Sequence, residues 1–343
     1  MENNKPFLSI CIPTYNRVNK LKKLVLDILS SPLHNIEVVV LDNCSTDNTL
    51  AMLNEIKDER LFVYQNNENI GHILNILKVL QLGRGIYSLS CVDKDWLNAE
   101  YLSDFINILQ RNMDVAIGYC DLNITDEAES VFFDSGVNSI INLGYLSKHQ
   151  SGNFYKTEKY KSLEILNRIF LEKDKFDFSM EIINAELAYY YKGVIISIPL
   201  ITPNYKDKDD YAKDKSYSYK NDFFSPERRT VEYGKYIMHI STLLLSKKDK
   251  KKIIAKVFEE GFYWCTIRYK LIMKEEYILQ HFQVEQKKIS IIDFIYYVYN
   301  YYKSFFYLNI QMNYIEKFIF MLEQSLYISF KFIVKIIKKN NKQ

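Results

Sequence analysis

The feature that most constrains this fold is the regular alternation of short apolar runs with helical patterns in the N-terminal third. The apolar runs are continuous and rich in β-branched residues, which is typical of parallel strands covered on both faces. Between them, apolar residues recur at helical spacing, as in residues 19–29. This alternation predicts βαβ units, and therefore an α/β fold with a mostly parallel sheet flanked by helices. The expected strands are residues 8–12, 36–41, 61–64, 86–92 and 115–119.

The remaining elements are expected from the same patterns. Helices are predicted over residues 19–29, 47–56, 70–82 and 100–110, and Asp47 or Thr46 is expected to cap the second of them. After Cys120 we expect a loop and hairpin over 121–150, helices over 157–171 and 178–191, and a strand over 194–198, with Gly193 closing the second helix. Residues 206–220 predict a loop. From Pro226 onward the chain predicts helices rich in Tyr, Phe and Lys.

Composition and charge exclude several classes of protein. The formal net charge of +3 is too small to indicate nucleic-acid binding. The five cysteines form an odd set without a close pair, so neither a disulfide framework nor a zinc site is predicted. The polar first residues do not resemble a secretion signal, and no run of eighteen apolar residues occurs. We therefore expect a cytoplasmic protein, or one bound peripherally to a membrane face.

Polar residues stand at four positions where an expected strand ends or an expected helix begins. In an open parallel sheet, ligands bind beyond the carboxyl ends of the strands. The segments at those positions are residues 13–17, 42–49, 69–71 with Asn75, and 93–95. The turn after the first strand lacks the glycines of a dinucleotide-binding site, and no Walker-type motif occurs. Asp93 and Asp95 are instead suited to hold a divalent cation that neutralises a diphosphate.

These four segments together resemble family 2 glycosyltransferases. The matching stretches are SICIPTYNR from Ser9, VVLDN from Val39 with the following Ser45-Thr46-Asp47, Asn69-Ile70-Gly71 with Asn75, and Asp93-Lys94-Asp95. The Asp42-Asn43 pair and the acidic spacing resemble bacterial abequosyltransferase-like members most. The resemblance covers residues 8–96 strongly and 97–200 loosely. It implies a GT-A, Rossmann-like catalytic domain over 1–205 that binds a nucleotide sugar, and a helical C-terminal region over 206–343.

The resemblance also implies a role for individual residues. Pro13, Thr14, Tyr15 and Arg17 would form the nucleotide pocket, Asp42 would accept a hydrogen bond from the pyrimidine ring, and Asn69 and Gly71 would line the ribose side. Asp93 and Asp95 would form the acidic pair that contacts the ribose and Mn²⁺ or Mg²⁺. Members of the family place a catalytic base about a dozen residues before a glycine that ends a helix. Counting back from Gly193 gives Glu181 as first choice and Asp177 as second.

Structural interpretations compete with these roles. Asp47 is favoured as a helix cap, whereas Asp42 is favoured as a ligand-binding residue over a helix cap. Asp93 and Asp95 are favoured as ligand-binding residues over turn carboxylates. His149 is favoured as a surface loop residue over a contact with metal or acceptor. The C-terminal aromatic residues are favoured as core packing.

The end of the chain carries a basic amphipathic pattern. From residue 324 to 343 there are five lysines and no acid, and Leu326, Phe330, Ile333 and Ile337 lie opposite the lysines on a helix. This pattern favours contact with an anionic membrane face, and a packing or homo-oligomer helix is the alternative.

We therefore expect an inverting glycosyltransferase that moves a sugar from a nucleoside diphosphate, UDP first among them, to a hydroxyl of a glycan. The expected acceptor is lipid-linked, in bacterial surface polysaccharide assembly. The alternative is a catalytically idle GT-A protein that binds sugar nucleotides or acts as a scaffold. Lys94 next to the expected metal and the missing second acid of the base motif favour that alternative.

Overall fold

The computed structural model describes residues 5–122, 129–144, 149–171, 178–204, 224–281 and 284–340. The chain divides into two compact units, residues 1–218 and 219–343, which are described separately below. The boundary expected near residue 205 and the loop expected over 206–220 both fall at residues 205–223, outside the described ranges.

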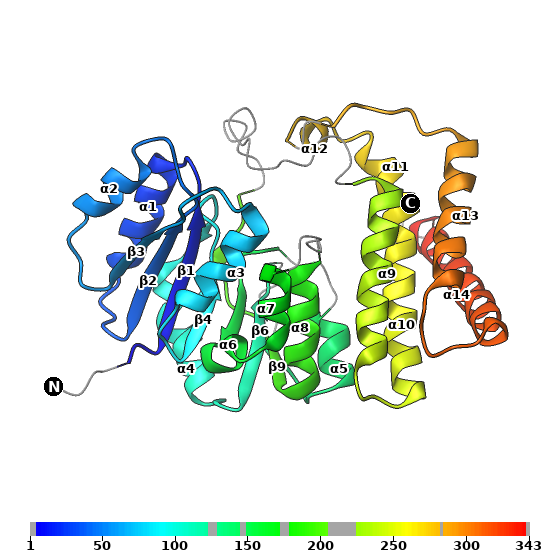
Figure 1. The fold of residues 1–343 in the computed structure, drawn as a ribbon, viewed down its shortest axis with the longest axis horizontal. Coiled ribbons are helices and arrows are strands. Elements are labelled where there is room, and N and C mark those ends of the chain that lie inside the picture. Colours follow the sequence, from blue (N-terminus) through cyan, green and yellow to red (C-terminus); the bar gives the residue numbers. More distant parts are fainter. Residues whose placement is uncertain are drawn as a thin grey trace. The chain divides into compact units, whose positions relative to one another are not determined.

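Unit 1 is built on an eight-stranded sheet with the order β3-β2-β1-β4-β8-β6-β9-β7 (Figure 1). The pairs β3-β2, β2-β1, β1-β4 and β6-β9 are parallel, whereas β8 and β7 run antiparallel to their neighbours. The predicted α/β fold with a mostly parallel sheet is thus confirmed. The strands are β1 (Leu8–Thr14), β2 (Ile36–Asp42), β3 (Leu61–Gln65), β4 (Tyr87–Ser90), β6 (Val115–Cys120), β7 (Val131–Phe133), β8 (Asn153–Lys156) and β9 (Lys192–Ile196).

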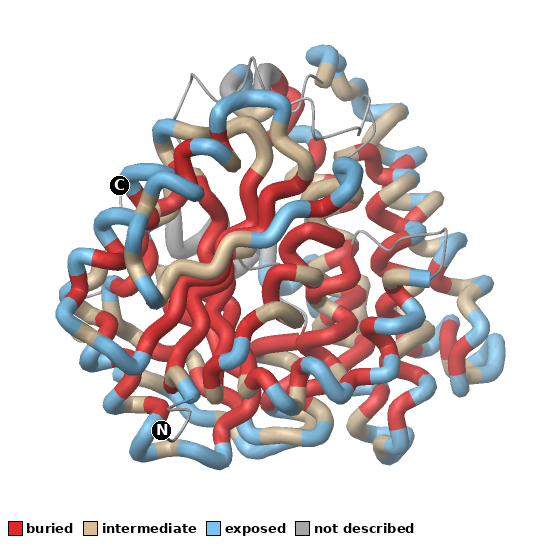
Figure 2. Tube along the Cα trace, turned by 60° about the vertical axis from the view of Figure 1, so that its left-hand side comes forward, coloured by how far each residue is buried: buried red, intermediate tan, exposed pale blue. Residues whose placement is uncertain are grey.

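Helices cover both faces of this sheet because its strands are apolar on both faces. Alternate β1 residues, such as Ile10 and Ile12, share one core cluster with α1 (Val18–Leu29) and α4 (Leu102–Gln110). The residues between them point to the opposite face, and there α3 (His72–Leu82) packs on β1. Figure 2 shows the resulting continuous buried centre. The helix α2 (Thr49–Glu55) packs beside α1.

The region after Cys120 differs from the sequence prediction in three places. Residues 157–171 form two helices, α6 (Thr157–Lys161) and α7 (Glu164–Leu171), rather than one. Within the described part of 121–150, β7 pairs with β9 instead of closing a hairpin, and the short α5 (Val137–Ser139) and a π-helix (Ile140–Gly144) follow. The helix α8 (Ser179–Tyr190) ends before Gly193, which lies inside β9.

Gly193 is therefore a packing glycine and not a helix terminator. A Cβ at this position would lie 2.2 Å from a methyl carbon of Leu143 and 2.8 Å from the hydroxyl of Ser139. Only a residue without a side chain lets β9 approach the π-helix this closely. The sequence could not distinguish this use of glycine from a C-cap.

A small antiparallel ribbon lies beside the end of β4. Its strands are β5 (Trp96–Leu97) and β10 (Ile201–Thr202), and Asn98 strengthens the pairing by donating its backbone N–H to the Leu200 carbonyl at 2.9 Å. A short 3₁₀ helix (Ala99–Tyr101) leads from the ribbon into α4. The ribbon brings a segment a hundred residues later in sequence up to the Asp93-Asp95 turn.

Unit 2 is helical, as expected. It contains α9 (Pro226–Thr242), α10 (Lys247–Phe262), a π-helix (Tyr263–Arg268), α11 (Tyr269–Ile272), α12 (Glu276–His281), α13 (Ile291–Tyr307) and α14 (Tyr314–Asn340). Phe258 of α10 packs against Phe305 and Phe320 with ring centroids 4.8 and 5.7 Å apart. These aromatic residues form core, as predicted. Among the described residues, none of the helices has both the length and the apolar character needed to cross a membrane.

Candidate functional site at the carboxyl edge of the sheet

The candidate site lies where the strand order reverses. From β1 the chain builds the sheet outward through β2 and β3, and then returns to place β4 on the other side of β1. Such a switch point opens a crevice beyond the strand ends, which is where ligands bind in open α/β sheets. Thr14 ends β1, Asp42 ends β2, and Asp93 and Asp95 follow β4. The topology therefore brings three of the four predicted segments to one edge.

Asp93 is the most firmly held residue at this edge. It is buried, and one carboxylate oxygen accepts a hydrogen bond from the Thr14 hydroxyl at 2.7 Å. The other oxygen accepts a charge-assisted hydrogen bond from the Arg17 guanidinium at 2.9 Å. The sequence-predicted residues Thr14, Arg17 and Asp93 thus form one cluster. Within it, Thr14 and Arg17 position the carboxylate.

Asp95 is held from a different side. One of its carboxylate oxygens accepts a hydrogen bond from the Asn204 backbone N–H at 3.0 Å, just after the β5-β10 ribbon. The other accepts a hydrogen bond from the Ser151 hydroxyl. Ser151 also accepts the Val92 N–H at 2.8 Å, so it fixes the turn that carries both aspartates. Asp95 is almost completely buried.

His149 lies in this site, and the expectation that it is a surface loop residue is wrong. Its Nδ1 is 3.3 Å from a carboxylate oxygen of Asp95, and its side chain is only 16% exposed. Burial lowers the pKa of the His149 imidazole, although attraction to Asp95 acts in the opposite direction and repulsion from Lys94 adds to the lowering.

Asp42 is fully buried and organises the loop after β2. It accepts the Ser45 backbone N–H at 3.1 Å and the Gln65 side-chain amide at 2.9 Å, and it also binds the Ser45 hydroxyl. The Ser45 N–H is shared by both carboxylate oxygens, so each oxygen of Asp42 already accepts two contacts, and a carboxylate has about four acceptor positions. The structural role of Asp42 is therefore larger than the sequence indicated.

The loops after β1 and β2 are joined by hydrogen bonds. The Asn16 amide oxygen accepts the Thr46 N–H at 2.7 Å, and the Asn16 N–H donates to the Ser45 hydroxyl at 2.8 Å. Asn16 and Cys44 have φ of 54° and 64°, a left-handed conformation that costs energy outside glycine and is concentrated at functional sites. Pro13 is buried in β1, whereas Tyr15 beside this loop is partly exposed.

Asn69 and Gly71 belong to an asparagine network at the start of α3. The Asn69 side chain accepts hydrogen bonds from the Asn43 amide at 2.7 Å and from the Gly71 N–H at 2.9 Å. Gly71 has φ of 87°, a left-handed conformation that favours glycine, although a Cβ at this position would meet no atom within 4 Å. A hollow of about 520 Å³ borders Asn69, Ile70 and Lys78.

Glu181 lies on a different element from the other candidates. It is in the first turn of α8 and is partly exposed. Its charge contributes to the raised pKa of the Tyr155 hydroxyl, whose main cause is burial. Tyr155 comes from β8 and donates to the Asn184 side chain, one turn after Glu181, at 2.8 Å. Asp177, the second candidate base, lies outside the described residues.

The helix-cap interpretation of Asp47 is only partly confirmed, because the N-cap residue of α2 is Asn48, which makes no side-chain capping bond, and Asp47 lies one residue earlier. Its carboxylate accepts the Thr49 backbone N–H at 3.0 Å in the first turn of α2. Asp47 therefore serves local structure.

The carboxylates of Asp93 and Asp95 suit a cation that also binds substrate phosphates. Among the described residues, no three His, Cys, Asp or Glu side chains come together as a closed metal cage. Mg²⁺ commonly takes one or two carboxylates and completes its shell with water and substrate phosphates. Asp93 already carries the Arg17 charge, so Asp95 is the more available carboxylate. The arrangement suits a metal that binds together with a diphosphate.

Three contributors were missed by the sequence analysis. Ser151 and Asn204 hold Asp95 from 56 and 109 residues away, and Gln65 holds Asp42. Serine and amide residues in loops carry no distinctive sequence signal. Pairing of β5 with β10 and of β8 with β4 brings Asn204 and Ser151 to Asp95, and pairing of β2 with β3 sets Gln65 opposite Asp42.

The fold and the site together define a GT-A-type α/β protein with an acidic pair at the sheet switch point. Residues 9–159 match the model of "Glycosyl transferase family 2". The matched stretch is less than half of the chain, and over it the sequence is similar to that family.

Curated relatives of this chain are also named as glycosyltransferases. The chain is 32% identical to abequosyltransferase RfbV of Salmonella typhimurium over 36% of either chain. It is 30% identical to the UDP-Glc:alpha-D-GlcNAc-diphosphoundecaprenol beta-1,3-glucosyltransferase WfaP of Escherichia coli, over 41% of this chain and 56% of WfaP. Glycosyltransferase GlyA of Streptococcus pneumoniae is 26% identical over 47% of this chain and 23% of GlyA. The matched segments thus span 23% to 56% of these relatives' lengths.

Solved structures agree on the fold. S. aureus TarS in complex with UDP has a TM-score of 0.57 at 16% identity, over 87% of this chain and 80% of that one. The mannosyltransferase PcManGT of Pyrobaculum calidifontis, in complex with GDP-Man and Mn²⁺, has a TM-score of 0.50 at 13% identity, over 79% and 75%. At these identities the likeness concerns the fold alone.

Proposed function

We propose that this protein transfers a sugar from a nucleoside diphosphate sugar, UDP first among the nucleotides, to a hydroxyl of a glycan acceptor. The observation that carries the proposal is the pair of buried carboxylates at the β1-β4 switch point of a family 2 domain, with Asp93 held by Thr14 and Arg17. TarS, whose fold is similar, was solved with UDP, and WfaP is named for a UDP-sugar donor.

The proposal gives most of the predicted residues a role in this chemistry. Tyr15 and Asp42 would bind the nucleotide base from the loops after β1 and β2, and Asn69 and Gly71 would border the ribose. Asp95, with Asp93, would hold Mn²⁺ or Mg²⁺, which when bound supplies neutralisation of the diphosphate leaving group. Arg17 orients Asp93 by its charge-assisted hydrogen bond.

The transfer proposed is a single displacement with inversion. The acceptor oxygen forms a bond to the anomeric carbon while the bond from that carbon to the diphosphate oxygen breaks, and UDP leaves. Glu181 is proposed to take the proton of the acceptor hydroxyl as the new bond forms. Its position in the first turn of α8 leaves it partly exposed, as a base that meets an incoming acceptor must be.

A lipid-linked acceptor in bacterial surface polysaccharide assembly is proposed from two observations. WfaP is named for an acceptor on diphosphoundecaprenol. In unit 2, Leu326 and Phe330 of the predicted amphipathic stripe are 72% and 65% exposed. We propose that residues 324–343 contact the cytoplasmic membrane face, because exposed apolar residues flanked by lysines suit an anionic interface.

The test is donor turnover by the full chain. Incubation with UDP-sugars and Mn²⁺ should release UDP slowly by hydrolysis, and faster when a lipid-linked glycan is added. A protein that binds UDP-sugar, with a raised melting temperature, yet releases no UDP under any of these conditions would be the idle GT-A binding protein instead. Absence of both binding and release across UDP-, GDP- and dTDP-sugars would contradict the proposal.

A further inference from the structure

Charge is divided unevenly between the two units. Residues 219–343 contain 22 Lys and Arg against 12 Asp and Glu, a formal charge of +10. Residues 1–218 contain 23 against 30, a formal charge of −7. The small net charge of the whole chain therefore hides a strongly basic helical unit. Such a unit attracts anionic partners and repels a second copy of itself.

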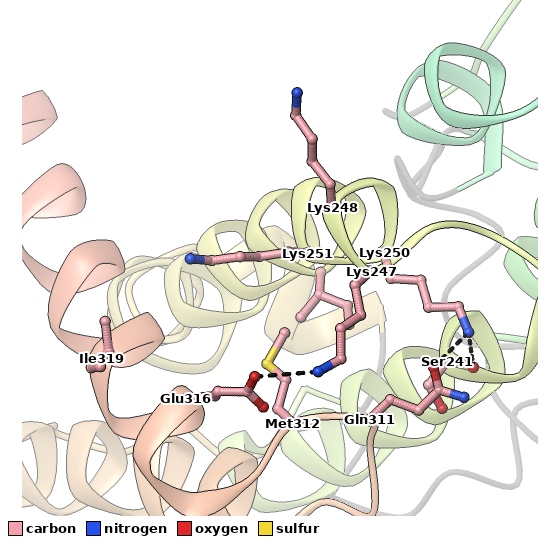
Figure 3. Close-up of a pocket in the computed structure, with 10 residues that line it drawn as sticks. Ser241, Lys247, Lys248, Lys250, Lys251, Gln311, Met312, Glu316 and Ile319 are labelled. Carbon is pink, nitrogen blue, oxygen red and sulfur yellow. Dashed lines mark hydrogen bonds and ion pairs between the residues drawn. The ribbon is translucent and has the colours of Figure 1, made fainter.

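A pocket of about 350 Å³ in unit 2 collects part of this charge (Figure 3). Lys247, Lys250 and Lys251 recur at helical spacing on α10, and Ile254 follows on the same face. Met312 and Ile319 form the apolar part of the lining. Glu316 is the only acid that lines the pocket among the described residues. The pocket is thus cationic at its polar groups and apolar in much of its wall.

Lys250 is the unusual member of this group. It is only 7% exposed, and its ammonium donates to the Ser241 carbonyl at 2.7 Å and to the Gln311 side-chain oxygen at 3.0 Å. Both partners are neutral, and within the described part of the chain Lys250 forms no ion pair. An ammonium has three donors, so one remains for a further acceptor. A buried cation without an anion is costly, and a bound anion would remove that cost.

The other lysines can bind an anion at little cost in free energy. Lys247 pairs with Glu316 at 3.3 Å and Lys251 with Glu323 at 2.8 Å, and all four side chains are 43% or more exposed. Exposed pairs of this kind contribute at most about 1 kcal/mol, so an incoming anion can replace the carboxylates. In Figure 3, Lys248 points away from the other pocket residues. It is exposed and stands beside Lys247.

The apolar wall continues onto an exposed helix face. Ile319 lines the pocket and is itself 48% exposed, and its neighbours Ile315, Phe318 and Leu322 on α14 are also exposed. These positions follow helical spacing and lead to Leu326 and Phe330. A free phosphate would use the lysines and leave this wall exposed to water. A molecule with a phosphate and an apolar chain uses both.

We propose that this pocket binds the phosphate group of an anionic lipid, with Lys250 and Lys247 on the phosphate and Met312 and Ile319 against the adjoining apolar chain. The inference rests on the membrane contact proposed above and specifies the lipid group that the protein would bind there. It is independent of glycosyl transfer, because all residues involved belong to unit 2.

The test measures binding of short-chain, dispersed dihexanoyl phosphatidic acid to the full chain by titration calorimetry. Lys250→Met keeps the aliphatic stem and removes the charge, and Lys247→Gln removes a second cation. Each should weaken binding about tenfold, the effect of one charge-assisted hydrogen bond. Lys288→Gln, which removes an exposed lysine outside the pocket, should leave the affinity unchanged. Thermal melting of each variant confirms that it is folded.

Four results would overturn the inference. Equal affinity in the wild type, Lys250→Met and Lys247→Gln would remove the pocket from the binding site. Inorganic phosphate that binds as tightly as the lipid would identify free phosphate as the ligand. Dihexanoyl phosphatidylcholine that binds as tightly would make the interaction purely apolar. Binding of wild type and variants alike to anionic vesicles would leave the membrane contact standing while the pocket inference fails.

Discussion

The Arg17 guanidinium donates a hydrogen bond to the Asp93 carboxylate at 2.9 Å, joining the loop before α1 to the end of β4. The pair is largely buried, with side-chain exposures of 14% and 1%. It connects residues 76 positions apart in sequence. The candidate site therefore has an internal cation that holds one of its two acidic residues.

Removing only one partner of this ion pair should destabilise the fold. Arg17→Met leaves Asp93 buried without its cation, so the free energy of unfolding should fall by about 3–5 kcal/mol. Adding Asp93→Asn to that variant removes the stranded charge, and the double variant should lose less than the two single variants combined. Urea unfolding of the four proteins measures this coupling. Strictly additive losses would mean that the two side chains do not stabilise each other.

Asp95→Asn should abolish most donor turnover. The amide keeps the shape, and its one oxygen can still accept the Asn204 N–H, but its NH₂ group cannot accept from the Ser151 hydroxyl and the charge that a divalent cation requires is lost. The melting temperature should change little, and excess chelator should have the same effect on the wild type. UDP release assays with and without Mn²⁺ measure this. A fully active variant, or full activity in chelator, would exclude a metal at Asp95.

Asp42→Ala should weaken UDP binding by about 1.5–3 kcal/mol, the contribution of a charge-assisted hydrogen bond. The structure adds a second effect, because the Ser45 N–H and the Gln65 amide lose a buried acceptor and the melting temperature should also fall. Gln65→Met is the matched control, since it removes one internal donor and keeps the carboxylate. Calorimetry with UDP should show a much smaller loss for the control. Equal affinity of Asp42→Ala and wild type would make Asp42 a purely structural residue.

Glu181→Gln should lower transfer by roughly 10²–10⁴ and leave donor binding intact, because glutamine keeps the shape but cannot accept the proton. Glu186→Gln is a control on the same helix, where burial and repulsion from Glu164 raise the pKa of Glu186. Asp177→Asn should also have a much smaller effect. Single-turnover transfer rates rank the three variants. A larger loss in Glu186→Gln or Asp177→Asn would move the base away from Glu181.

Replacing Leu326 and Phe330 with glutamine should release the protein from anionic vesicles. Both side chains are exposed, so the fold should be unaffected. Leu171→Gln changes an apolar residue that is 83% exposed in unit 1 and should leave vesicle binding unchanged. Binding should also weaken at high salt, where lysine–lipid attraction is screened. Co-sedimentation with vesicles measures lipid binding by all three proteins. If replacing Leu326 and Phe330 abolishes a dimer but not lipid binding, the two side chains belong to a packing surface.

The sequence determined those features that depend on local pattern. Continuous β-branched runs can be buried only as central strands, so the parallel sheet and its polar strand ends follow from residues such as Ile10, Asp42 and Asp93. The motifs also predicted the family, because each is a contiguous stretch whose residues act together. The hydrogen bond from the Thr49 N–H to Asp47, just before α2, is likewise local.

Only the tertiary structure decided which distant residues hold the site. His149, Ser151 and Asn204 reach Asp95 because β8 enters the sheet antiparallel and β10 pairs with β5. Gly193 lies where β9 meets a π-helix, a constraint that no local pattern carries. Side-chain contacts across a sheet depend on strand order and register, and these are set by the packing of the whole chain rather than by any single segment.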